Sequence, residues 1–122
     1  MALAGGTRHL RPLGGTYIQV TGGSARRAMP GRGLWSAGAQ ATRALVHAAA
    51  QELRAEGVHV ALLVVDGTIE SPKTAVATAG QPREALVEQV AVAEAVRALA
   101  EQGPRGLTHE LVLTPAGDRW TP

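Results

Sequence analysis

The stretch VHVALLVV at residues 58–65 decides the fold, because seven of its eight side chains are apolar. A strand with one solvated face would alternate between polar and apolar residues, whereas this pattern predicts burial on both faces. Such strands occur in parallel sheets that helices cover on both sides. Asp66-Gly67 follows directly and predicts a turn at the end of the strand.

A helical pattern lies on each side of this strand. The upstream helix is predicted from Ser36, a candidate N-cap, to Glu56, with Gly57 as its stop. The downstream helix is predicted from Pro82 at its first turn to about Gln102. Residues at helical spacing predict the buried faces: Ala37, Ala41, Leu45, Ala48, Ala49 and Leu53 in the first helix, and Leu86, Val90, Ala93 and Ala100 in the second.

Two shorter strands complete the pattern. TYIQVT at residues 16–21 lies between two Gly-Gly pairs, and HELVL at residues 109–113 follows the second helix. The order strand, helix, strand, helix, strand favours right-handed crossovers and a parallel sheet. We therefore expect an α/β three-layer sandwich with a short parallel sheet and flanking helices.

Composition restricts the class of protein further. The chain has 122 residues, enough for one domain, and 45% of them are hydrophobic. It has no Phe, one Tyr and two Trp, so small aliphatic side chains must fill the core, and each buries little area. We expect a marginally stable domain that depends on a partner. The absence of Cys excludes disulfides, a thiol nucleophile and thiolate metal ligands.

Charge is distributed unevenly along the chain. Residues 1–50 hold six Arg and no acidic residue, a formal charge of +6, whereas residues 51–122 hold ten acidic and six basic residues, a charge of −4. We interpret the two halves as complementary rather than as a nucleic-acid surface, because no aromatic residues alternate with the basic ones. No apolar run approaches the roughly 20 residues of a membrane span, and residues 1–12 lack a signal-peptide pattern. A cytoplasmic protein is expected.

Four segments in this order carry a family resemblance: GGTYIQVTGG (14–23), SARRAMPGRGLWSAGAQATRAL (24–45), GVHVALLVVDGTIESP (57–72) and GLTHELVLTP (106–115). Together they resemble the C-terminal half of a short-chain dehydrogenase/reductase, over residues 14–120. The resemblance implies that residues 1–122 form a single truncated domain with a partial Rossmann-like fold.

The catalytic residues of that family are replaced here. Its catalytic Tyr falls on Trp35, its Lys on Ala39 and its Ser on Gly22, with Thr21 and Ser24 beside the last position. In the family the Tyr transfers a proton, the Lys lowers the Tyr pKa and holds the ribose, and the Ser orients the carbonyl. An indole is no proton acid near neutral pH, and Ala carries no charge. The resemblance therefore implies that ordinary hydride transfer is lost.

The glycine-rich dinucleotide fingerprint of such enzymes has no counterpart before residue 14. Gly31-Arg32-Gly33 is a glycine pair in the wrong place, after the first strand of this chain, and predicts a turn. We therefore expect no bound nicotinamide cofactor.

Several residues remain as site candidates. Asp66 follows the buried strand at the edge where open α/β sheets place their sites, and it is the best acid/base candidate. The alternative is a turn Asp that only caps the loop. Thr21 and Ser24 offer hydroxyl groups for catalysis, and Glu70 could form a carboxylate pair with Asp66.

Arginine and tryptophan suggest binding roles. Arg26, with Arg27, could hold an anionic ligand or be solvated. Trp35 is interpreted as filling the core or the old substrate cleft, with stacking on a hydrophobic or aromatic ligand as the alternative. The histidines lack metal-site spacing, so we expect no metal and structural roles for them: His9, His47, His59 and His109.

Three functions stay open. The first is a non-redox structural or interaction module that forms a homodimer or pairs with a chain supplying the missing half. The resemblance supports a dimer, since in the family the helix matching residues 36–56 and the final strand pack between subunits. The second is a cofactor-independent isomerase, cyclase or dehydratase that uses the old cleft for a small-molecule ligand. The third is a half-enzyme that binds NAD(P) with a partner chain.

Overall fold

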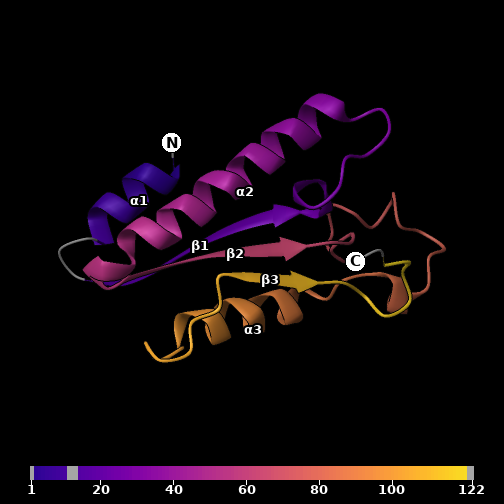
Figure 1. The fold of residues 1–122 in the computed structure, drawn as a ribbon. Coiled ribbons are helices and arrows are strands. Elements are labelled where there is room, and N and C mark those ends of the chain that lie inside the picture. Colours follow the sequence, from indigo (N-terminus) through magenta and orange to yellow (C-terminus); the bar gives the residue numbers. More distant parts are fainter. Residues whose placement is uncertain (1, 11–13, 121–122) are drawn as a thin grey trace.

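The computed structural model describes residues 2–10 and 14–120 and has a single sheet between helical layers (Figure 1). The expected α/β three-layer architecture is confirmed. Its main elements are α1 (Ala2–Leu10), β1 (Gly15–Gly22), α2 (Gly33–Leu53), β2 (Val58–Val65), α3 (Gln89–Ala100) and β3 (Glu110–Leu113). Short 3-10 turns follow β1 (Gly23–Ala25), follow α2 (Arg54–Glu56) and precede α3 (Arg83–Ala85).

The sheet has three parallel strands in the order β1-β2-β3. β1 pairs with β2 along its whole length, from Gly15 opposite Val58 to Gly22 opposite Val65. β3 pairs with the second half of β2, beginning with Leu62 opposite Glu110. The carboxyl ends of all three strands therefore meet at one edge of the sheet.

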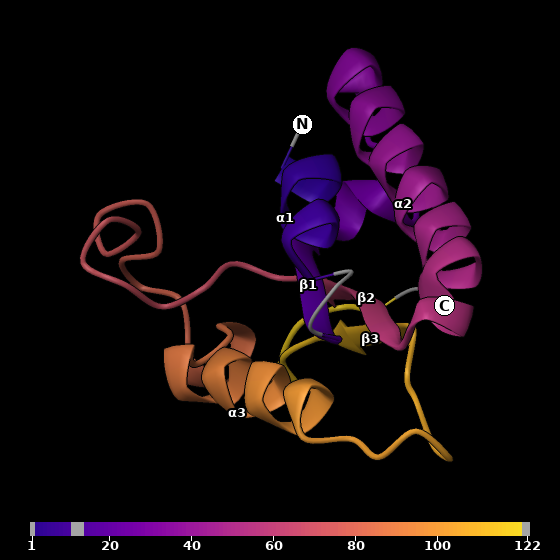
Figure 2. The same ribbon diagram turned by 90° about the vertical axis from the view of Figure 1, so that its left-hand side faces the viewer.

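β2 is buried along its entire length, as its apolar sequence predicts. One face packs under α1 and α2, and the other packs against α3 (Figure 2). The first face contributes Val58, Val60, Leu62 and Val64 to a cluster with Leu3, Val46, Ala50 and Leu53. The second contributes Ala61, Leu63 and Val65 to a cluster with Val87, Ala95 and Leu99.

The helix α1 was not predicted from the sequence, because Gly5 and Gly6 weaken its local helical preference. Tertiary packing stabilises it: Leu3 is 5% exposed and belongs to the cluster under α2. Gly6 is required there, because a Cβ at this position would lie 2.6 Å from Cδ2 of Tyr17 on β1.

The start and the buried face of α2 differ from the prediction. The helix begins at Gly33 rather than Ser36, and Ser36 is buried inside it, where its Oγ accepts a hydrogen bond from the Met29 N–H at 3.1 Å. The predicted Leu53 is buried, but the other buried apolar side chains are Val46 and Ala50, and the predicted Leu45 is 48% exposed. Alanines occupy nearly every side of this helix, so their spacing could not distinguish the inner from the outer face.

The predicted start of the second helix at Pro82 is also wrong, since α3 begins at Gln89. The reason is a long-range contact: Val87 donates its N–H to the Thr68 carbonyl at 2.9 Å and accepts from the Glu70 N–H at 2.8 Å. This pairing holds the chain before α3 extended. The buried residues of α3 are Ala95 and Leu99; of the predicted residues, Leu86 is buried ahead of the helix, whereas Val90 is 56% exposed.

Core packing leads to a stability prediction. Leu99 is 1% exposed, so Leu99→Ala should lower the free energy of unfolding by about 2–5 kcal/mol through lost burial and a cavity. Val76 is 90% exposed, so the control Val76→Ala should change it by about 0.5 kcal/mol or less. Urea denaturation followed by circular dichroism measures both, and equal losses would contradict the position of α3.

Candidate functional site

Asp66 lies at the carboxyl end of β2 and is paired with two arginines. Its side chain is 6% exposed. Arg27 binds the carboxylate through two hydrogen bonds, NH1 to Oδ2 at 3.0 Å and NH2 to Oδ1 at 3.3 Å. Arg26 adds a third, NH1 to Oδ2 at 3.3 Å. The structure thus brings together Asp66, predicted as an acid/base candidate, and Arg26, predicted as an anion-binding candidate.

The strand register explains this meeting. Gly22 is opposite Val65, so the residues that follow β1 lie at the same edge of the sheet as Asp66. The 3-10 turn after β1 then directs Arg26 and Arg27 back over the end of β2, and the N–H groups of both donate to the Gly23 carbonyl.

Gly23 makes this close approach possible. A Cβ built on Gly23 would overlap the Asp66 carboxylate, at 2.8 Å from its Cγ. Any larger side chain would displace either the turn or the carboxylate. This role of Gly23 arises from a tertiary contact and has no local signal in the sequence. An Arg doublet after one parallel strand and an Asp after the next are, however, a sequence signal for the ion pairs.

The ion pairs determine what Asp66 can do chemically. An ionised carboxylate only accepts hydrogen bonds, and here three arginine N–H groups occupy it. Because the carboxylate is buried, removing the arginines would leave a charge without compensation, which is strongly unfavourable. This arrangement suits a structural link between two loops better than a general base, which needs an open lone pair towards its substrate.

Trp120 covers one of these arginines. The centre of its ring lies 5.5 Å from Cζ of Arg26, within cation–π range. The Arg26 side chain is only 14% exposed. The segment after β3 therefore reaches the same edge of the sheet, a contact that the local sequence did not indicate.

The two hydroxyl candidates lie close to this cluster in sequence but differ in environment. Ser24 is buried, its Oγ donates to Sδ of Met29 at 3.5 Å, and its carbonyl accepts from Nε2 of Gln40 at 3.4 Å. Thr21 is half-buried near the end of β1. Ser24 is therefore held in the packing between the turn and α2.

Trp35 and Glu70 do not take part in the ion pairs of Asp66 with Arg26 and Arg27. Trp35 is 69% exposed on the first turn of α2, so the interpretation that it fills the core is wrong. Its ring borders a surface hollow of about 530 Å³ formed with residues 31–34. Glu70 pairs with Arg83, Oε1 to Nε at 3.8 Å, so each carboxylate has its own arginine partner.

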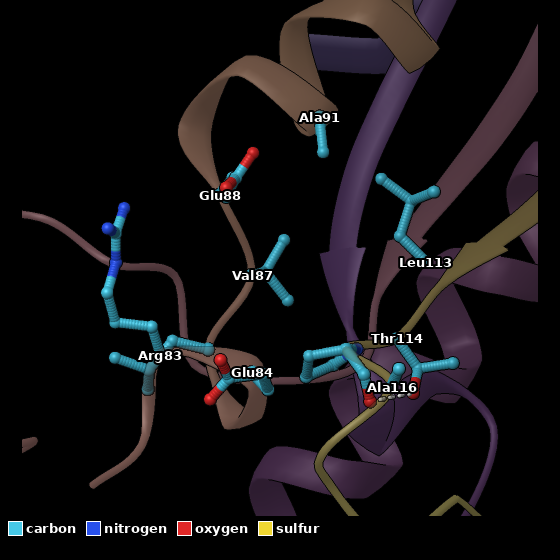
Figure 3. A pocket seen from close by; sticks show the side chains of 10 residues that line it. Arg83, Glu84, Val87, Glu88, Ala91, Leu113, Thr114 and Ala116 are labelled. Atoms are coloured by element: carbon cyan, nitrogen blue, oxygen red, sulfur yellow. Dashed lines mark hydrogen bonds between the residues drawn. The ribbon is translucent and has the colours of Figure 1, made fainter.

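A second hollow of about 510 Å³ lies between the end of β3 and the start of α3 (Figure 3). Val87 and Leu113 form apolar walls, and Glu84 and Glu88 contribute carboxylates. None of the predicted site residues is among those lining it.

The histidines do not form a metal centre in the described part of the chain. Among residues 2–10 and 14–120 no three His, Asp or Glu side chains converge as metal ligands. His47 lies on α2 with Nε2 at 3.2 Å from Oε1 of Glu110, which also binds Arg43. His59 and His109 contact each other, and the side chain of His9 lies outside the described part.

The fold matches that of dehydrogenases of known structure. An alcohol dehydrogenase from the archaeon Thermococcus sibiricus, solved in complex with 5-hydroxy-NADP, aligns with a TM-score of 0.77 and 24% identity over 98% of this chain and 49% of that one. A 4-hydroxyisoleucine dehydrogenase in complex with NADH gives 0.70 and 16%, over 93% and 50%. A short-chain dehydrogenase from Rhodopseudomonas palustris gives 0.66 and 22%, over 88% and 41%.

These comparisons identify the fold. The chain has the Rossmann-like α/β fold of short-chain dehydrogenases and spans about half the length of these solved chains. No protein-family model matches the sequence, and no curated protein matches it significantly. Within the described residues, no helix combines the length and the apolar character needed to cross a membrane.

The close approach of Gly23 gives a second prediction. Gly23→Ala should lower the free energy of unfolding by about 1–3 kcal/mol, because the new methyl group overlaps a buried, ion-paired carboxylate. Gly103→Ala is the control: it lies outside α2, nothing lies within 4 Å of its Cβ position, and the free energy of unfolding should change by about 0.5 kcal/mol or less. Thermal unfolding of both variants measures the difference, and a neutral Gly23→Ala would contradict the packing of the turn on Asp66.

Proposed function

We propose that this chain forms one Rossmann-like domain that acts as a homodimeric interaction module without hydride-transfer activity. A cytoplasmic location is part of the same proposal and agrees with the absence of Cys. The observation that carries the proposal is the combination of an ion-paired Asp66 at the sheet edge and an exposed apolar face on α2.

The first argument concerns chemistry. By the resemblance to short-chain dehydrogenases, Trp35 and Ala39 occupy the positions of the proton donor and of the Lys that lowers its pKa. Trp35 is directed to solvent, and neither side chain can donate a proton near neutral pH. The best remaining acid/base candidate, Asp66, is bound by two arginines. These facts favour a non-redox role and weaken the alternative of an isomerase, cyclase or dehydratase.

The second argument concerns the outer surface of α2. Its solvent-facing residues are apolar or small for about four turns, apart from the exposed Gln40, and such an unpartnered face supports association. Small side chains let two helices approach closely. The exposed residues are Leu34, Trp35, Ala37, Gly38, Ala41, Ala44, Leu45 and Ala48.

The third argument concerns β1, which has β2 on one side and pairs with no other strand among the described residues. Val20 on this strand is 48% exposed. Edge strands of this kind invite pairing with another chain. A second copy or a partner chain that extends the sheet would therefore cover both β1 and the adjacent α1.

A charged residue on the outer face of α2 tests the dimer. Ala41→Glu should convert the dimer to a monomer, because a carboxylate at the centre of a close helix contact is desolvated without a partner. Ala93→Glu on the exposed face of α3 is the matched control and should leave the dimer intact. Sedimentation equilibrium measures the mass of each variant. A wild-type chain that is monomeric at tens of micromolar would refute the proposal.

The absence of cofactor binding is tested separately. Native mass spectrometry of the chain with added NADH or NADPH should detect a dimer without retained nucleotide. The 4-hydroxyisoleucine dehydrogenase and the archaeal alcohol dehydrogenase were solved with such nucleotides, and this chain spans only about half of each. A retained nucleotide would instead support the half-enzyme alternative, with a partner chain supplying the remaining strands.

A further inference from the structure

A hollow of about 520 Å³ lies at the amino-terminal edge of the sheet, opposite the edge that holds Asp66. Its volume is within the range of small-molecule sites in proteins. It is bounded by the starts of β1 and β2, the turn after α2, and the segment between α3 and β3. Its lining residues include Thr16, Arg54, Val58, His59, Gln102, Arg105 and Leu107.

The charged residues that line this hollow are both basic. Arg54 and Arg105 both border it, and none of the described residues that line it is acidic. Ala100 and Leu107 give it apolar walls. A pocket with apolar walls and two guanidinium groups is suited to a small molecule that is apolar in part and carries a carboxylate or phosphate.

His59 supplies an independent observation that points to a ligand. This residue is 5% exposed and lines the hollow. Its Nε2 lies 2.7 Å from the Thr108 carbonyl, which can only accept, so Nε2 carries the proton. Its Nδ1 is buried and has no hydrogen-bond partner within the described residues. Buried polar atoms are nearly always paired, so an atom of this kind is unusual.

His59 is also linked to one of the two arginines. Its ring meets the ring of His109 edge to face, with centroids 5.5 Å apart. Nε2 of His109 lies 2.6 Å from NH2 of Arg54, which can only donate, so Nδ1 of His109 carries the proton and donates to the Val60 carbonyl at 2.9 Å. An anion that binds Arg54 would therefore alter the surroundings of both histidine rings.

We propose that this hollow binds a small organic anion, whose carboxylate or phosphate contacts Arg54 and Arg105 while its apolar part lies against Ala100 and Leu107. His59 lines the hollow, so its ring would sense a molecule bound there. The site is separate from the Asp66 cluster and does not depend on the dimer proposed above.

Nuclear magnetic resonance of the full chain tests the proposal. The probes are 2-hydroxyhexanoate and hexyl phosphate, with uncharged hexanamide as the reference. The expected result is a saturable shift of the ring signals of His59 and His109 with at least one of the two anions and none with hexanamide. A response to only one anion supports the site and identifies its preferred charged group.

Two arginine variants complete the test. Arg105→Gln should weaken binding about tenfold, the typical effect of losing one charge-assisted hydrogen bond. Arg97→Gln is the control, since Arg97 lies on the exposed side of α3, pairs with Glu101 and does not line the hollow. Unfolding temperatures confirm that both variants fold. Absence of saturation with both anions, equal binding of hexanamide, or equal weakening by the two variants would overturn the proposal.

Discussion

The burial of β2 on both faces is the constraint on which the rest of this structure depends. Alternate side chains of one eight-residue strand belong to two separate clusters, one under α1 and α2 and one against α3. Because the core contains no Phe and few large side chains, this strand supplies much of the apolar area that stabilises both layers. Its backbone needs β1 and β3 as hydrogen-bonding partners, and their parallel direction places all loops at two opposite edges.

The loop that follows β2 shows how this constraint shapes the chemistry. Asp66 leaves the strand at the edge where α/β folds usually place their sites. The turn after β1 enters the same edge, and its two arginines bind the carboxylate. Gly23 allows the close approach, and Trp120 covers one arginine from the segment after β3. Three segments that are distant in sequence are thus joined by the ion pairs of Asp66 and the contact between Arg26 and Trp120.

The surface properties agree with a role in association. The outer face of α2 exposes small and apolar side chains, including Trp35 at its first turn, and β1 presents a strand edge. A fold shared with dehydrogenases does not by itself imply their reaction, because reactions depend on particular side chains. The opposite edge of the sheet combines two arginines with a buried histidine, and the two guanidinium groups are suited to binding an anion.

The sequence by itself determined the three strands, the two longer helices, the parallel layered class and the position of Asp66 at a sheet edge, because periodicity and turn residues are local signals. Only the tertiary structure decided α1, the inner faces of the helices and the late start of α3. Alanine-rich helices look alike on all sides, and the pairing of Val87 with Thr68 competes with helix formation. The ion pairs of Asp66 likewise depend on strand register, which brings residues 39 positions apart into contact.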